Sequence, residues 1–183
     1  MDKITGLSPV ISIEQKTTNK NPRSTVGTTT EVYDYLRLLY ARAGEAYSYL
    51  SGEKMVKYTE EQILDLILKD YKGKRIYILA PLVRSRKGHY KELFEQVRKK
   101  GYLYVRVDGE VREVLPGMKL DRYKNHDVEV VIDKLVVTDK DDTRLKNSVA
   151  TAMRQGDGLL MILDAQTDSV RHYSKRLMCP VTG

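Results

Sequence analysis

The sequence predicts one α/β (α+β) domain, a mixed β-sheet with flanking helices, preceded by a short strand–loop–helix piece. The length of 183 residues suits one domain, or one compact domain with an appendage. Apolar residues with a period of two alternate along the chain with apolar residues at helical spacing. Some predicted strands are joined by tight turns and others by helices, so the sheet should combine hairpins with helical crossovers and not be purely parallel.

At the N-terminal end, the sequence predicts a brief strand, a loop and an amphipathic helix. The alternation in Val10-Ile11-Ser12-Ile13 indicates a strand, and residues 16–30 have the composition of a loop. A capping-box pattern that begins at Thr28, with apolar positions behind it, predicts a helix over about 29–43. Residues 45–57 show no clear period, and we place the main boundary or linker there.

Behind this boundary we expect helices and strands in turn. Thr59 and Gln62 form a second capping box before a short helix that ends ahead of Lys72. Asp108-Gly109 is the strongest hairpin signal, because a type I′ turn needs positive φ at both central positions. The other expected elements are a strand over 76–83 that frays at Pro81, a helix between 88 and 101, strands over 102–107, 110–114 and 128–137, a helix around 145–153, and closing strands over 159–163 and 170–173.

Composition excludes several classes of protein. No window approaches the roughly 18 consecutive apolar residues of a membrane span, and the first residues form no signal peptide, so we expect a cytoplasmic protein without membrane contact. The single cysteine, Cys179, excludes intramolecular disulfides and thiolate-rich zinc sites. The histidines lack the spacing of a metal site and are interpreted as surface or interface residues; they are His89, His126 and His172. No P-loop, dinucleotide-binding or hydrolase motif occurs, so we expect no chemistry from the chain alone.

Most of the net charge of +7 lies in one window. From Arg84 to Arg106 there are eight lysine or arginine residues against two glutamates, a net charge of +6. A solvated helix face with a flexible basic loop would explain this pattern. A binding patch would explain it too, because Arg84-Ser85-Arg86-Lys87-Gly88 follows a predicted strand and precedes a helix. Phosphates and an acidic protein surface both fit such cations as partners, and composition does not choose between them.

Three separated blocks of sequence point to one family. They are residues 6–42, which include Gly6-Leu7-Ser8-Pro9-Val10-Ile11-Ser12-Ile13-Glu14-Gln15, then Leu79-Ala80-Pro81-Leu82-Val83-Arg84-Ser85-Arg86-Lys87-Gly88, and finally Val105-Arg106-Val107-Asp108-Gly109-Glu110 with residues 130–137. On these blocks the chain resembles the first nucleotide-binding half of UvrA, the damage-sensing ATPase family of bacterial nucleotide excision repair. The resemblance covers nearly the whole chain and implies a fragment that lacks the family's first Walker A and signature sequences.

The resemblance implies a division of the chain. Residues 1–45 would be part of ATP-binding domain I of an ABC-type ATPase, and 46–55 a linker in place of a zinc module. Residues 56–174 would be the inserted domain that docks UvrB, and 175–183 a return segment toward the ATPase and signature domain. Gln15 matches the Q-loop glutamine, which senses magnesium and the γ-phosphate in the intact family; without a P-loop we expect it to be solvated.

The resemblance also implies cofactors and partners. ATP and magnesium would belong to the intact parent, and we expect the fragment to be no enzyme. The family often holds a zinc with two C-P-x-C-G motifs. Here residues 45–50 replace the first motif, and the second survives only as Cys179-Pro180-Val181-Thr182-Gly183, so we expect no zinc. The expected partners are UvrB, damaged DNA through the parent, and a second parent copy in a homodimer.

The leading hypothesis is a protein-interaction module that docks UvrB for loading onto damaged DNA. A polar interface of this kind would depend on charge complementarity. The alternative is a nucleic-acid-binding module that uses the basic 84–106 patch, and a third reading is an ATPase by analogy with the family. The predicted contact residues are Arg84, Arg86, Lys87, His89, Lys91, Arg106, Asp108 and Glu110.

Overall fold

The computed structural model describes residues 32–138 and 143–179 of the chain. The chain divides into two compact units, Met1–Glu45 and Ala46–Gly183. The strand predicted over 10–13, the loop over 16–30 and the Q-loop match Gln15 lie outside the described residues. None of the helices in the described ranges is both long and apolar enough to cross a membrane.

Helix α2 (Val32–Ala43) is the described part of the first unit and corresponds to the helix predicted over 29–43. It ends at Gly44, whose amide donates a hydrogen bond to the Tyr40 carbonyl at 3.0 Å. A Cβ at Gly44 would lie 2.5 Å from that carbonyl oxygen, so a glycine is needed here. Along α2 no described residue is buried, and Tyr35 and Leu39 are 69% and 59% exposed.

The second unit is built on a six-stranded sheet in the order β3-β2-β4-β1-β5-β6. Every neighbouring pair in this sheet is antiparallel. The predicted class, an α/β (α+β) sheet with flanking helices, is confirmed, whereas the parallel pairs of a mixed sheet are not among the pairings. The strands are β1 (Arg75–Lys87), β2 (Tyr104–Val107), β3 (Glu110–Glu113), β4 (Asn125–Val136), β5 (Leu159–Asp164) and β6 (Val170–Ser174).

The sheet contains two helical crossovers and is still antiparallel throughout, because each crossover skips over one strand of the sheet. Helix α4 (Lys91–Lys99) connects β1 to β2, and α5 (Thr143–Gln155) connects β4 to β5. Strands β1 and β2 both pair antiparallel with β4, so they run parallel to each other with β4 between them. Strands β4 and β5 are separated by β1 in the same way. Each crossover therefore joins parallel strands, but another strand is inserted between them, as in split βαβ folds.

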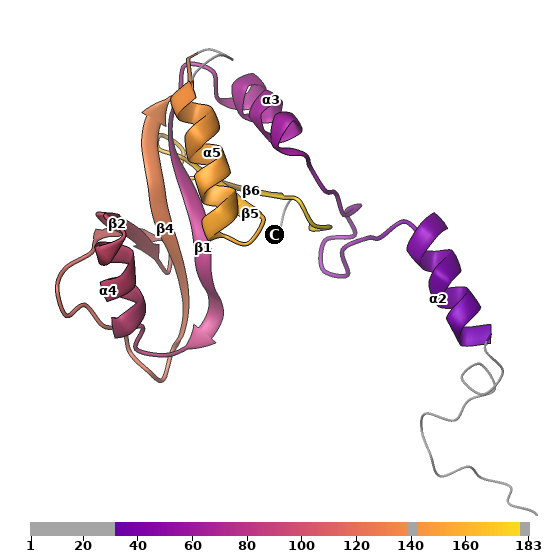
Figure 1. The fold of residues 1–183 in the computed structure, drawn as a ribbon, viewed down its shortest axis with the longest axis horizontal. Coiled ribbons are helices and arrows are strands. Elements are labelled where there is room, and N and C mark those ends of the chain that lie inside the picture. Colours follow the sequence, from indigo (N-terminus) through magenta and orange to yellow (C-terminus); the bar gives the residue numbers. More distant parts are fainter. Residues whose placement is uncertain (1–31, 139–142, 180–183) are drawn as a thin grey trace, which may run out of the picture. The chain divides into compact units, whose positions relative to one another are not determined.

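The main core lies between the sheet and three helices on one of its faces. Figure 1 shows α4 in front of β2 and α5 in front of β1 and β4. Helix α3 (Glu60–Tyr71) contributes Ile63 and Ile67 to the same core, and α4 contributes Phe94. The capping box predicted for α3 is confirmed, because Gln62 N donates to Thr59 Oγ1 at 3.2 Å and Thr59 N donates to Gln62 Oε1 at 2.9 Å.

A smaller cluster lies on the opposite face of the sheet. Its buried members all belong to strands: Leu79 on β1, Val131 on β4, and Met161 and Leu163 on β5. The half-buried side chains packed against it are also strand residues. The sheet therefore has one face covered by helices and one face built from strand side chains alone.

Strand β1 is longer than the predicted strand over 76–83, and it continues through Pro81 to Lys87. Its pairing with β5 ends at Leu79, and Pro81 lies opposite Glu129 of β4. Beyond Leu79 only β4 pairs with β1, so the missing amide of the proline costs the sheet no bond to β5. The basic residues after Val83 are thus carried on the end of a strand and not on a free loop.

Replacing Phe94 with alanine tests whether α4 is anchored by this core. Phe94 is 1% exposed, so loss of its ring should lower the free energy of unfolding by about 3–5 kcal/mol. Urea unfolding followed by circular dichroism measures the change. The control Leu103→Ala removes a side chain that is 64% exposed and should change the value by less than about 0.5 kcal/mol. Equal effects of the two substitutions would contradict this packing.

Candidate functional site

Residues 84–91 run from the end of β1 into α4, and we call them the basic segment. Five of the predicted contact residues lie in it, and all five are exposed: Arg84, Arg86, Lys87, His89 and Lys91. Their side chains form no ion pair or hydrogen bond with any residue in the ranges 32–138 and 143–179. The charges of the two arginines and two lysines are therefore not neutralised by these parts of the chain.

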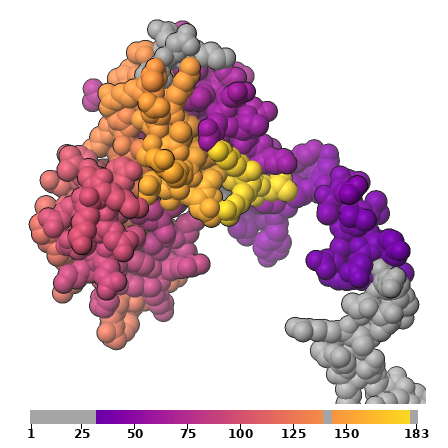
Figure 2. Space-filling model, in the orientation of Figure 1, coloured from indigo at the N-terminus to yellow at the C-terminus, as the bar shows by residue number. Residues whose placement is uncertain are grey.

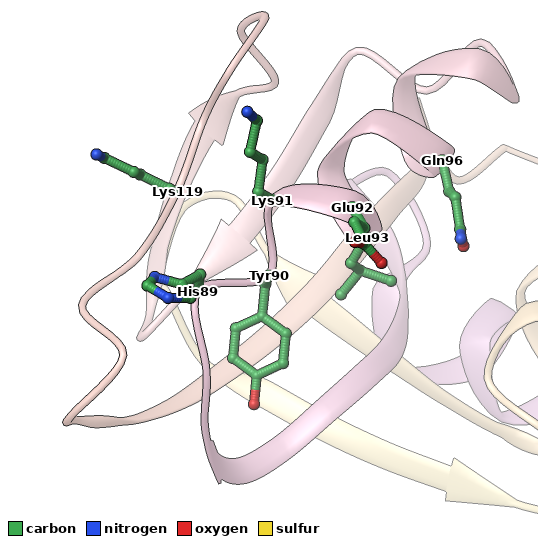
Figure 3. A pocket seen from close by; sticks show the side chains of 7 residues that line it. All are labelled: His89, Tyr90, Lys91, Glu92, Leu93, Gln96 and Lys119. Carbon is green, nitrogen blue, oxygen red and sulfur yellow. The ribbon is translucent and has the colours of Figure 1, made fainter.

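A groove of about 750 Å³ lies beside the basic segment at the start of α4. Figure 3 shows His89, Lys91 and Lys119 together on one side of this groove and Gln96 on the other. Lys119 comes from the connection between β3 and β4, which is tied to the basic segment because Leu120 N donates to the His89 carbonyl at 2.9 Å. In the space-filling view, the rose-coloured residues around 90–110 gather at one end of the visible face (Figure 2).

The other three predicted contact residues are engaged in internal contacts. Arg106 Nη1 lies 3.6 Å from Glu129 Oε2, and both side chains are largely buried. Arg112 Nη2 lies 2.6 Å from Glu110 Oε2, and Asp108 Oδ2 lies 2.6 Å from His126 Nδ1. The structure thus places five of the eight predicted residues together in the basic segment, with unpaired side chains. The side chains of the remaining three are paired with other residues of the unit.

His126 is the central buried residue beneath the basic segment, at 6% exposure. Its Nδ1 lies 2.6 Å from Asp108 Oδ2 and its Nε2 lies 2.8 Å from the Asp121 carbonyl oxygen. The bond to Asp108 raises the pKa of the His126 imidazole, against the opposing effect of burial. The interpretation of His126 as a surface or interface residue is therefore wrong, because its ring is buried within its own unit. β4 begins at Asn125, not at 128, so His126 belongs to the sheet and pairs with Arg86 of β1.

The turn between β2 and β3 is linked to the basic segment through β4. Asp108 has φ +50 and Gly109 has φ +93, as the predicted type I′ turn requires. Asp108 Oδ1 accepts from Asp127 N at 2.9 Å, and Asp127 Oδ1 accepts from Ser85 N at 2.7 Å. Burial opposes ionisation of Asp108, but the bonds from His126 and the Asp127 amide outweigh it and lower the pKa of the carboxyl. Pattern reasoning missed this network, because its members lie far apart in sequence.

Tyr90 lies where the basic segment enters α4, and its side chain folds back onto the backbone of the segment. It is the N-cap of α4 and has φ +56, in the left-handed region. Its hydroxyl lies 2.7 Å from the Arg86 carbonyl oxygen and 3.1 Å from that of Lys87, and its ring meets the His126 ring edge-on. A Cβ at Gly88 would lie 2.9 Å from the Tyr90 ring, so the glycine allows the chain to pass under it.

The pair of Arg106 and Glu129 lies on the face of the sheet that is formed by strand side chains. Burial raises the pKa of Glu129 to about 7, although the Arg106 guanidinium partly offsets it. On the edge strand β6, burial together with Arg84 and Arg106 lowers the pKa of His172. Arg106 thus acts mainly on buried titratable groups, which removes it from the surface open to a partner.

The residues around Cys179 do not fit the zinc site that the family resemblance suggests. Cys179 is buried, and its Sγ lies 3.1 Å from Ser51 Oγ. A structural zinc site needs four ligands, most often thiolates and imidazoles, and the chain has one cysteine. Among the residues that the structure describes, no group of three or more histidine, cysteine or carboxylate side chains is arranged to hold a metal ion.

The raised pKa of Glu129 predicts a pH-dependent stability. A carboxyl that binds its proton more tightly when folded loses stability as pH rises from about 4.5 to about 7, because the unfolded chain ionises first. Relative to the wild type, Glu129→Gln should therefore gain about 1–3 kcal/mol of unfolding free energy between pH 4.5 and pH 8. Urea titrations at several pH values measure this difference. A difference that stays constant with pH would show that Glu129 is ionised throughout.

Comparisons with known proteins identify the family to which the chain belongs. Residues 58–166 match the UvrA interaction domain. The chain is 48% identical to UvrABC system protein A of Deinococcus radiodurans, 49% identical to that of Methanothermobacter thermautotrophicus and 46% identical to that of Bacillus subtilis. Each comparison covers 100% of this chain and 19% of the relative, so the chain spans about a fifth of the length of these curated relatives. Because the matched domain occupies more than half of its residues, the chain belongs to the UvrA interaction domain family.

Proposed function

We propose that the chain is the part of a UvrA-type protein that docks UvrB, for loading onto damaged DNA in nucleotide excision repair. The observation that carries this proposal is the basic segment, with exposed cations that the described residues leave unpaired. Arginine forms bidentate hydrogen bonds with carboxylates, so a patch of this kind suits an acidic protein surface. The match to an interaction domain and the names of the relatives support the same assignment.

The contact surface that we propose is narrower than the sequence suggests. It comprises Arg84, Arg86, Lys87, His89 and Lys91, with Lys119 on the same side of the groove as His89 and Lys91. Arg106, Asp108 and Glu110 are assigned an indirect role, because each already has a partner within the unit. Electrostatic attraction by the free cations would steer the approach of an acidic partner, and the association should weaken as salt screens it.

An acidic protein fits this surface better than a nucleic acid does. Proteins that bind single strands stack bases on exposed aromatic rings. The ring of Tyr104, on β2 within the basic 84–106 patch, has the Lys134 ammonium 3.3 Å from its centroid. That ring face is already occupied by a cation, which argues against base stacking there. DNA binding remains the competing outcome of the binding experiment below.

ATP turnover, DNA binding and dimer formation are proposed for the longer parent protein. The sequence contains no P-loop motif, and Gln15 is the proposed magnesium and γ-phosphate sensor in the parent. We propose that the 183-residue chain hydrolyses no ATP by itself. A magnesium-dependent ATPase assay of the purified chain tests this, and turnover above that of a mock preparation would overturn it.

Reversing the charge of two arginines tests the docking surface. The variant Arg84→Glu with Arg86→Glu should weaken binding to purified UvrB by about a hundredfold or more, because like charges across an interface cost several kcal/mol. Isothermal titration calorimetry at moderate salt measures the affinity, and thermal melting must match that of the wild type.

The matched control is Lys69→Glu with Lys72→Glu, which causes the same change in net charge on exposed residues at the end of α3. These lysines and the two arginines lie at opposite ends of β1, so the control should bind UvrB within about threefold of the wild type. A fluorescent DNA duplex is titrated beside UvrB. Retained UvrB binding by the arginine variant would refute this placement. Binding to DNA but not to UvrB would assign the patch to phosphates, with a log–log salt slope of about −0.9 per phosphate.

A further inference from the structure

The two hydrogen bonds of His126 determine its protonation state. A carboxylate oxygen and a backbone carbonyl oxygen are both acceptors, so the ring nitrogens facing them must both be donors. Asp108 Oδ2 lies 2.6 Å from Nδ1 and the Asp121 carbonyl oxygen lies 2.8 Å from Nε2. A neutral imidazole carries one N–H and would leave one of these short contacts between two acceptors. Because the lowered pKa of Asp108 keeps its carboxyl ionised and therefore an acceptor, these contacts correspond to an imidazolium ion.

This imidazolium lies where the basic segment is fixed to the sheet. His126 is opposite Arg86 in the ladder between β1 and β4, and its ring meets Tyr90 at a centroid distance of 6.4 Å. Asp108, held by His126, also binds the Asp127 amide, and the Asp127 carboxylate in turn holds the Ser85 amide. Two routes thus connect His126 to the segment, one through Tyr90 and one through Asp127.

We propose that His126 is a positioning residue for the basic segment: as an imidazolium bound to Asp108 and to the Asp121 carbonyl, it maintains the conformation in which the free cations meet an acidic partner. This inference rests on the docking function proposed above. His126 itself is buried, so it acts through the segment and not by direct contact. Its role is to keep Ser85 and Tyr90 in left-handed conformations that side chains rarely adopt unaided.

The charges around His126 favour its protonated form. Asp108 faces it from the turn between β2 and β3, and Asp121 faces it from the connection before β4. Asp127 follows it on β4 and binds Asp108 through its backbone amide. Tyr90 of α4 offers a ring edge, and Arg112 of β3 acts on Asp108. Arg86 of β1 lies opposite His126 in the ladder. The three aspartates still outnumber the two arginines next to the imidazole, which compensates for its burial.

The direction of the pH dependence follows from these shifts. A histidine whose pKa is raised on folding stabilises the fold fully below its ordinary value of 6.5, and this contribution is lost as pH rises through the raised value. The lowered pKa of Asp108 contributes stability above the ordinary value of 3.8, which is lost as pH falls through the lowered value. The segment should thus be held below the raised pKa of His126 and released as pH rises above it.

Nitrogen NMR of the full 183-residue chain reads the protonation of His126 directly and needs no partner. The expected result at pH 7 is that both ring nitrogens carry a proton, with a titration midpoint above 6.5. Amide hydrogen exchange at Ser85 should accelerate with the same midpoint. In the control His89→Gln, which removes the exposed histidine of the segment, this exchange should be unchanged. A His126 ring that is neutral at pH 7 would overturn the proposal.

The variant Asp108→Asn removes the negative charge of residue 108 and keeps the size of its side chain. An asparagine keeps an acceptor for the Asp127 amide and tolerates positive φ, but its NH₂ group donates to Nδ1. His126 should then become neutral with its proton on Nε2, and its titration midpoint should fall below that of the wild type. A midpoint that does not move would show that Asp108 does not hold the proton and would overturn the proposal.

Binding to UvrB gives the functional readout. At pH 7 the affinity of Asp108→Asn should be roughly tenfold weaker than that of the wild type, the scale of one charge-assisted hydrogen bond. The affinity of the wild type should fall with rising pH at the midpoint found by NMR. Affinity that does not follow this midpoint would overturn the positioning role. Absence of wild-type binding at every pH would instead refute the docking function, while the NMR titration would still decide the protonation of His126.

Discussion

The antiparallel ladder between β1 and β4 is the constraint on which the rest of the second unit depends. These are the two longest strands, with 13 and 12 residues, and β2 and β5 attach to their outer edges. A slip of one residue in this register would turn Ile76, Ile78 and Ala80 away from the helices and bring the opposite face of β1 into the core. The same slip would separate Arg86 from His126. One register therefore fixes both the hydrophobic core and the position of the basic segment.

The basic segment stays compact in spite of its charge because its backbone, not its side chains, is held. The carbonyls of Arg86 and Lys87 bind the Tyr90 hydroxyl, and the Ser85 amide binds Asp127. The guanidinium and ammonium groups are left in water, where their mutual repulsion is weak. A segment ordered in advance loses little conformational entropy when a partner arrives. Free charges on a fixed backbone are thus a combination suited to recognition.

Local pattern predicted most elements of this fold but few of the contacts of its candidate site. The capping box at Thr59 and the Asp108-Gly109 turn were readable, because short-range hydrogen bonds and steric limits on φ decide them. The continuation of β1 through Pro81 could not be predicted from the local sequence, since it depends on where the pairing of β1 with β5 stops. The partner of Asp108 lies 18 residues away on a strand that pairs with two others, so no local period reveals that His126 is buried.

Two segments far apart in sequence, near the beginning and the end of the described part of the second unit, lie side by side. Val56 and Met178 form an antiparallel bridge, and residues 46–55 fold back on themselves through a bridge between Tyr47 and Lys54. This pairing joins residues 122 positions apart, so it closes the described part of the unit into one loop whose two ends are fixed next to each other. In this chain, backbone bonds and the packing of Cys179 against Ser51 hold these points together. The closure of this unit therefore depends on main-chain pairing between distant segments, the same kind of interaction that fixes the register of β1 and β4.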